Sequence, residues 1–111
     1  MNWPKIPYHN FLDAIMAIQP ADAEFIAVWH KLSADEGYRW HHHPKANEWV
    51  LIRGGVLQVF TEKNIREYDL RGNRDIRVFH FPPGSKHTLR AVTDLKYLVV
   101  RDCDDISVYD E

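Results

Sequence analysis

The chain has 111 residues, a length that suits one domain with one hydrophobic core. Its composition is that of an ordinary globular protein, and a net charge of −2 gives no general attraction to nucleic acid or to an anionic membrane. The single cysteine, Cys103, excludes an intramolecular disulfide and favours a cytoplasmic location, and no apolar run is long enough to span a membrane.

The first predicted element is a short helix over residues 11–18. Asn10 can cap its N-terminus, Asp13 lies in its first turn, and Pro20 ends the segment. The apolar residues of this segment recur at helical spacing and would form one stripe on the helix surface. We therefore expect the helix to cover one end or the outer face of a barrel.

From residue 24 the pattern changes to short extended runs separated by turn residues, which is typical of a β-sandwich or a β-barrel. The predicted strands cover residues 25–32, 38–43, 48–53, 56–61, 65–70, 76–81, 88–92 and 95–100, with a further edge strand over 106–109. Gly54-Gly55 suits a tight hairpin turn, and Pro83-Gly84 suits a type II turn because glycine accepts the positive φ needed there. We predict a single domain over residues 1–111, with its barrel core at about 24–102.

Several side chains with metal-binding atoms lie close to this predicted core. His41 and His43 are two residues apart, which on a β-strand places both imidazoles on one face, about 7 Å apart at the backbone. Pro44 begins a turn, and Glu48 opens an apolar strand that can fold back beside the first. Two imidazoles and a carboxylate on neighbouring strands make a site for a divalent metal ion. His87, which follows the Pro-Pro-Gly turn, is a fourth candidate ligand.

The spacing His-x-His-x4-Glu-x6-Gly, followed by Pro-x-Gly-x2-His, resembles the two signature motifs of the cupin superfamily. The matching residues are His41, His43, Glu48, Gly55, Pro82, Gly84 and His87. Two positions depart from the family pattern: Gly37 lies closer to the first histidine than the usual glycine, and Ala91 stands where an asparagine is often found. Neither position is a candidate metal ligand.

This resemblance implies an all-β, cupin-type β-barrel, also described as a double-stranded β-helix or jelly roll, with the short helix at its N-terminal side. It also implies one bound metal ion, a concave pocket for a small molecule and a tendency to dimerise. Three imidazoles and one carboxylate suit divalent iron, manganese, nickel, cobalt, copper or zinc, and ligand type does not separate these metals.

Three further residues are candidates for binding a substrate. Arg39 shares face parity with His41 and His43, so its guanidinium would bind a carboxylate or phosphate in the cavity; the alternative is an arginine at the rim, in solvent. Val50 and Ile52 share the inward parity of Glu48 and would form an apolar wall.

Other aromatic and histidine side chains are assigned to packing. His30 is expected at the surface or in the core and not as a ligand, and His42 should point out of the barrel because it lies between two inward positions. Trp40 and Trp49 are offset by one from inward residues, so we expect them to pack against the helix or a second subunit.

Two hypotheses for function follow from this pattern. The first is a metalloenzyme of dioxygenase or isomerase type that acts on a small oxygenated organic or sugar-like substrate. The second is a non-catalytic module that binds or senses a small molecule, with a link to polysaccharide metabolism as one option. No further general acid or base is assigned in the pocket, and neither nucleic acid nor membrane is an expected partner. A homodimer is expected because the aromatic residues exceed what one small barrel can bury: Trp3, Phe25, Trp29, Trp40, Trp49 and Tyr109.

Overall fold

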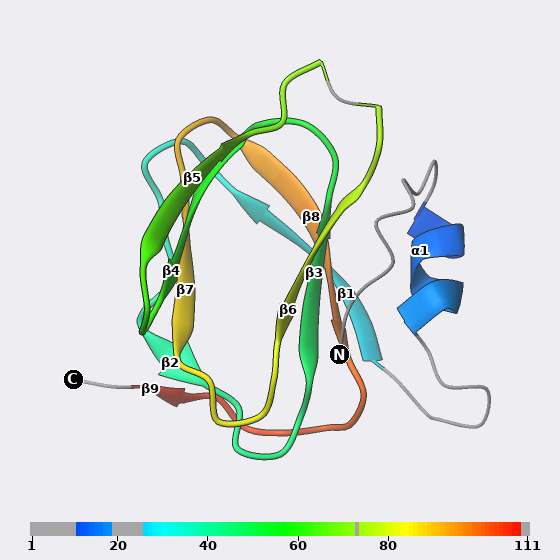
Figure 1. The fold of residues 1–111 in the computed structure, drawn as a ribbon, viewed down its shortest axis with the longest axis vertical. Helices are drawn as coiled ribbons and strands as arrows, with labels where there is room; N and C mark the ends of the chain where they lie inside the picture. Colours follow the sequence, from blue (N-terminus) through cyan, green and yellow to red (C-terminus); the bar gives the residue numbers. More distant parts are fainter. Residues whose placement is uncertain (1–10, 19–25, 73, 110–111) are drawn as a thin grey trace.

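The computed structural model describes residues 11–18, 26–72 and 74–109 of the chain, which form one short helix and two facing antiparallel sheets (Figure 1). The four-stranded sheet has the order β1 (Ile26–Leu32), β8 (Leu95–Arg101), β3 (Glu48–Ile52) and β6 (Arg77–Phe81). The five-stranded sheet has the order β5 (Ile65–Asp69), β4 (Val56–Thr61), β7 (His87–Ala91), β2 (His41–His42) and β9 (Val108–Tyr109). No helix in the described part of the chain is long and apolar enough to cross a membrane.

The inner faces of the two sheets form the main hydrophobic core. Val50 and Ile52 of β3 point into it together with Tyr97 of β8, and they meet Leu57 and Leu89 from the opposite sheet. This alternation follows from the period of two along a strand, which sends every second side chain to the same face. The predicted inward parity of Val50 and Ile52 is therefore confirmed.

The outer face of the four-stranded sheet is covered by α1 (Phe11–Ile18), which lies beside that sheet in Figure 1. Ala14 and Ile18 of the helix pack with Trp49 and Leu51 in a second apolar cluster. The predicted helix and the packing of Trp49 against it are confirmed, whereas the proposed cap Asn10 and the breaker Pro20 lie outside the described residues. Because β3 contributes to both clusters, all five of its residues are buried.

The connection between β3 and β4 corrects the sequence prediction. Gly54 and Gly55 have φ values of 75° and 81°, as a turn through glycines requires, but β3 and β4 belong to different sheets. The turn is therefore a corner between the sheets and not a hairpin. A Cβ atom on Gly55 would lie 2.6 Å from Cδ2 of Leu95, so this corner also needs a glycine for space.

The same topology corrects the expected arrangement of the histidine strand. The predicted strand over 38–43 contains only two ladder residues, His41 and His42, and β3 does not fold back beside them. Instead β2 lies between β7 and β9, and β9 confirms the predicted edge strand near the C-terminal end of the described chain.

Candidate metal centre

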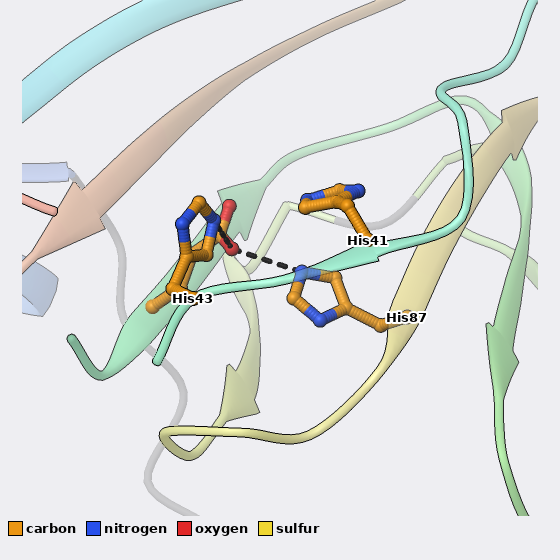
Figure 2. A group of neighbouring side chains, drawn as sticks. His41, His43 and His87 are labelled. Carbon is orange, nitrogen blue, oxygen red and sulfur yellow. Dashed lines mark hydrogen bonds and ion pairs between the residues drawn. The ribbon is translucent and has the colours of Figure 1, made fainter. Parts of the chain in front are cut away.

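The four predicted ligands converge from both sheets. His41 on β2 is paired directly with His87 on β7, His43 follows β2, and Glu48 begins β3 in the facing sheet. One ligand atom from each residue lies within 4.8 Å of the others, and Figure 2 shows the three histidine rings turned toward a common centre. His43, Glu48 and His87 are buried, and His41 is half-buried. The cluster is thus built across the barrel, where the sequence had suggested neighbouring strands.

Backbone carbonyls fix the orientation of all three imidazole rings. In each ring Nδ1 carries the hydrogen, because its partner is a carbonyl oxygen that can only accept. The acceptors for His41, His43 and His87 are the carbonyls of Arg39 (2.8 Å), Ile106 (3.0 Å) and Ser85 (3.0 Å). Histidine ligands of metals usually donate their second ring nitrogen in this way, which leaves the lone pair on Nε2 for the ion.

The contacts with Glu48 show that this cluster fits a cation. Nε2 of His43 and Nε2 of His87 each lie 2.9 Å from the same carboxylate oxygen, Oε2 of Glu48. With the ring hydrogens already on Nδ1, these nitrogens would present lone pairs to a negatively charged oxygen. That arrangement is repulsive unless a proton or a metal ion lies between the atoms. Three imidazole nitrogens and one carboxylate form a donor set suited to a divalent transition metal.

The electrostatics of the metal-free cluster centre on Glu48. Burial alone would raise the pKa of Glu48, but a proton between its Oε2 and the Nε2 atoms of His43 and His87 gives hydrogen bonds that hold this pKa well below its usual range. The same hydrogen bond raises the pKa of His43 above its ordinary value of 6.5 despite burial, whereas burial lowers the pKa of His41. The carboxylate therefore stays ionised near neutral pH and supplies one negative charge to balance a bound cation.

A cavity of about 150 Å³ adjoins the four ligands. Val50, Leu89 and Val99 give it an apolar wall, and Tyr38 and Tyr109, which are 37% and 50% exposed, lie where it meets solvent. An apolar cavity of this volume is known to hold a molecule the size of benzene. The cavity therefore suits a small substrate, or the reacting end of a larger one.

The candidate substrate residues occupy three different places. Val50 lines the cavity, as predicted, while Ile52 lies in the same core without lining the cavity. Arg39 is exposed, and its guanidinium carbon lies 4.8 Å from the ring centre of Tyr109, outside the lining. The arginine that does line the cavity is Arg101.

The cavity also contains a chain of hydrogen bonds that the sequence did not predict. The hydroxyl of Tyr97 donates to the hydroxyl of Tyr38 at 2.5 Å, and the Tyr38 oxygen lies 3.0 Å from Nδ1 of His30. Because the Tyr38 oxygen accepts from Tyr97, its own hydrogen is directed to His30. His30 and Tyr97 are paired across β1 and β8, and their rings stack with centres 5.8 Å apart.

Burial sets the protonation of these three groups. It lowers the pKa of His30 and raises the pKa of both Tyr38 and Tyr97, so the imidazole is neutral and both phenols are protonated near neutral pH. The signal for Tyr97 was present in the sequence: alternate residues of β8 share one face, so the inward position of Val99 also places Tyr97 and Arg101 inside.

Comparisons with known proteins support the fold assignment. No family model matches the sequence, and no curated protein matches it. Among solved structures, a sugar phosphate isomerase from a cupin superfamily of Silicibacter pomeroyi superposes with a TM-score of 0.65 at 19% identity, over 80% of this chain and 58% of that one. The chain has the cupin fold.

Two further structures have this cupin fold in common with the chain. A cupin 2 domain-containing protein from Halorhodospira halophila gives a TM-score of 0.64 at 18% identity, over 86% of this chain and 64% of that one. Oxalate oxidase in complex with the substrate analogue glycolate gives a TM-score of 0.62 at 18% identity, over 77% of this chain and 45% of that one. The chain thus spans about half to two thirds of the length of these three proteins, and identities this low show the fold alone.

Proposed function

We propose that the chain is a mononuclear metal-dependent enzyme, of isomerase or dioxygenase type, that acts on a small oxygenated organic or sugar-like substrate. One observation carries this proposal: a single cavity joins four converging metal ligands to three hydrogen-bonded groups that can carry a proton. His41, His43, Glu48 and His87 would hold the ion. A bound divalent metal would polarise a substrate oxygen or, if redox-active, activate dioxygen.

The hydroxyl chain supplies acid–base chemistry on the substrate side of the cavity. Tyr38 is the exposed phenol of the chain and lines the cavity, whereas Tyr97 is fully buried and donates the hydrogen bond that positions the Tyr38 oxygen. A proton accepted by the oxygen of Tyr38 releases the Tyr38 hydrogen to Nδ1 of His30. One proton thereby leaves the substrate, the Tyr38 phenol is regenerated, and the imidazole becomes cationic. Neutral His30 is the right starting state for this transfer, because its Nδ1 is free to accept.

Transfer of a proton from the substrate to His30 is the kind of step that an isomerase needs. Within the proposal we therefore favour the isomerase type. The apolar wall of Val50, Leu89 and Val99 supports it by limiting the water that competes for the proton. A purely structural metal would be closed by its ligands, whereas four protein ligands leave one or two positions of a five- or six-coordinate ion for substrate.

The test is a substrate screen with two readouts. The protein is loaded in turn with iron(II), manganese and zinc and offered small hydroxy acids, keto acids, diketones, thiols and nucleotide sugars. Exchange of substrate hydrogen with deuterated solvent reports the isomerase type, and oxygen uptake reports the dioxygenase type. Turnover should be lost in Glu48→Gln and His87→Ala and retained in Glu67→Gln, which removes a carboxylate from exposed β5.

The second candidate, a binding or sensing module with a link to polysaccharide metabolism, becomes the better account under one result. Compounds from the screen would bind at the cavity and remain chemically unchanged with every metal. In that case the hydroxyl chain would serve only to recognise ligand oxygens.

We also propose that the protein forms a homodimer through the edge of β1. This edge strand leaves Val28, on the inner face of the sheet, 43% exposed and Trp29, on the outer face, 50% exposed. A second copy that paired with this edge would cover both side chains. Trp49 does not contribute because α1 covers it, and Trp3 and Phe25 lie outside the described residues. Light scattering should give twice the chain mass of 13.1 kDa; a value of 13.1 kDa at micromolar concentration would refute the dimer. The cytoplasmic location likewise stays a prediction.

A further inference from the structure

We propose that Arg101 binds an oxyanion of the substrate, so that the cavity takes small acids whose carboxylate or phosphate lies on Arg101 while another oxygen reaches the metal. This proposal rests on the proposed function, because it concerns the substrate of the same cavity. It assigns the anion to a residue other than Arg39, for which the sequence pattern left both the cavity and the rim open.

The position of Arg101 directs its side chain toward the metal centre. Arg101 is the last residue of β8 and is paired with Glu48 of β3, and directly paired residues project to the same face of a sheet. Glu48 is one of the four converging ligands, and the side chain of Arg101 lines the cavity beside it. Arg39, in contrast, precedes β2 and lies over the ring of Tyr109.

Arg101 keeps its positive charge available for a ligand. Nη1 of Arg101 donates to the backbone carbonyl of Asp105 at 3.1 Å, and this neutral acceptor is its hydrogen-bond partner among the described residues. Neither Glu48 nor Asp105 forms an ion pair with Arg101 in this part of the chain. The fork of N–H donors that remains has the geometry that binds a carboxylate or a phosphate through two parallel hydrogen bonds.

The acidic groups near Arg101 are committed to other partners. Oε2 of Glu48 faces His43 and His87, as described above. The carboxylate of Asp102 accepts from the backbone and the side-chain amide of Asn47. The carboxylate of Asp105 accepts from backbone N–H groups, which belong to Lys45, Ala46 and Ile106. These hydrogen bonds fix the chain around the cavity without neutralising the guanidinium.

The charge balance of the metal-loaded cavity favours an anion. A divalent ion and Arg101 outweigh the single negative charge of Glu48, and burial keeps His30 neutral. The apolar wall of Val50, Leu89 and Val99 lowers the local dielectric constant, which strengthens attraction between the remaining positive charge and an anionic ligand. A neutral sugar or diketone would leave this charge uncompensated.

The experiment compares charged and uncharged probes of similar shape. Zinc-loaded protein is titrated by calorimetry with glycolate and 3-hydroxypropanoate, each against its primary amide, and with glycerol phosphate against glycerol. Within each pair the hydroxyl that can reach the metal is kept and only the oxyanion is changed. The proteins are the wild type, Arg101→Gln, Arg101→Lys and the matched control Arg39→Gln, and their zinc content and melting temperature are measured alongside.

We expect the wild type to prefer at least one acid over its uncharged partner by about 10-fold or more. Arg101→Gln should lower the binding affinity for that acid by about 10- to 100-fold, which is the range for loss of a hydrogen bond to a charged group. The affinity for the uncharged partner compound should not change. The affinity of Arg101→Lys for the acid should lie between those of the wild type and Arg101→Gln, because lysine keeps the positive charge and loses the paired N–H donors of the guanidinium. Whether the preferred acid is a carboxylate or a phosphate identifies the oxyanion.

Three results would overturn the proposal. The first is an equal affinity of the wild type for charged and uncharged probes. The second is an effect of Arg39→Gln on acid binding as large as that of Arg101→Gln. The third is loss of zinc from Arg101→Gln, which would assign Arg101 to the metal centre. If Arg101→Gln does not fold, the wild-type preference and Arg101→Lys decide. Absence of turnover with normal Arg101-dependent binding would refute the enzyme and leave this inference standing.

Discussion

The two sides of the metal centre are held in place by different means. Glu48 begins β3, a strand of five buried residues that lies between β8 and β6 and packs against both hydrophobic clusters. The facing sheet carries the three histidines: His87 on the five-residue strand β7, His41 on the two-residue strand β2, and His43 in the segment after β2. Its rings are oriented by hydrogen bonds to backbone carbonyls. We therefore expect Glu48 and His87 to be fixed by their strands, and His41 and His43 to depend on a bound ion for part of their order.

The largest expected effect comes from disrupting the β3 side. Leu51 is fully buried beneath α1, so Leu51→Ala should lower the free energy of unfolding by about 2–5 kcal/mol, the usual cost of a large-to-small change in a core. Ile65→Ala on β5, where the side chain is 63% exposed, should change it by no more than about 0.5 kcal/mol. Urea denaturation measures both; similar effects would show that β3 is no more rigidly packed than β5.

Metal binding should act mainly on the β2 side. An ion that binds only the folded state at a hundred times its dissociation constant stabilises the protein by about 2.7 kcal/mol. Hydrogen exchange should show the gain in protection over residues 41–47 and little change over 49–52, which the sheet already protects. A chelator should reverse both effects. An unchanged melting temperature after complete removal of the metal would contradict the expected stabilisation.

A smaller effect is expected from pH. The pKa of His43 is raised above 6.5, so its protonated form stabilises metal-free protein below that value, and this contribution is lost as pH rises through the raised pKa. Glu48 acts in the opposite sense, because its lowered pKa gives stability that is lost only as pH falls below its ordinary value of 4.5. Burial lowers the pKa values of His30 and His41, so these two groups act against His43 between pH 9 and pH 6. The His43 contribution is therefore measured by urea denaturation as the difference in stability between metal-free wild type and His43→Ala, and this difference should be larger at pH 6 than at pH 9.

The metal-loaded protein should respond to pH in the opposite direction. The proton on His43 must leave before its Nε2 binds an ion, so metal affinity should increase as pH rises through the raised pKa of His43. Zinc titrations at several pH values, with proton release followed in parallel, measure this. Affinity that does not vary between pH 6 and pH 9 would show that His43 does not bind the metal.

Much of the fold was predictable because it depends on local patterns. The alternation in β3 predicted both its inward residues and the outward packing of Trp49, and the helical spacing over 11–18 predicted α1. The four converging ligands were predictable from two motifs, since their spacing was enough without knowledge of strand pairing. The choice of sheet for each strand was not, because Gly54-Gly55 suits a hairpin and a corner equally well.

The substrate side of the cavity depends on long-range pairing, which a single sequence does not show. His30 and Tyr97 meet only because β1 pairs with β8, and Arg101 lies near Glu48 only because β8 also pairs with β3. Parity could not decide between the cavity and the rim for Arg39, because the chain before His41 is not a strand of the sheet and the period of two does not apply there; Arg39 is exposed, as the rim alternative expected.

The central claim is that one metal ion is bound by His41, His43, Glu48 and His87. Native mass spectrometry of the zinc-treated protein tests it most directly, with His43→Ala/His87→Ala compared against His30→Ala/His80→Ala, which removes two histidines outside the ligand set. We predict one zinc ion per chain in the wild type and in the His30→Ala/His80→Ala protein, and none in His43→Ala/His87→Ala. One ion per chain in His43→Ala/His87→Ala, or none in the wild type, would contradict it.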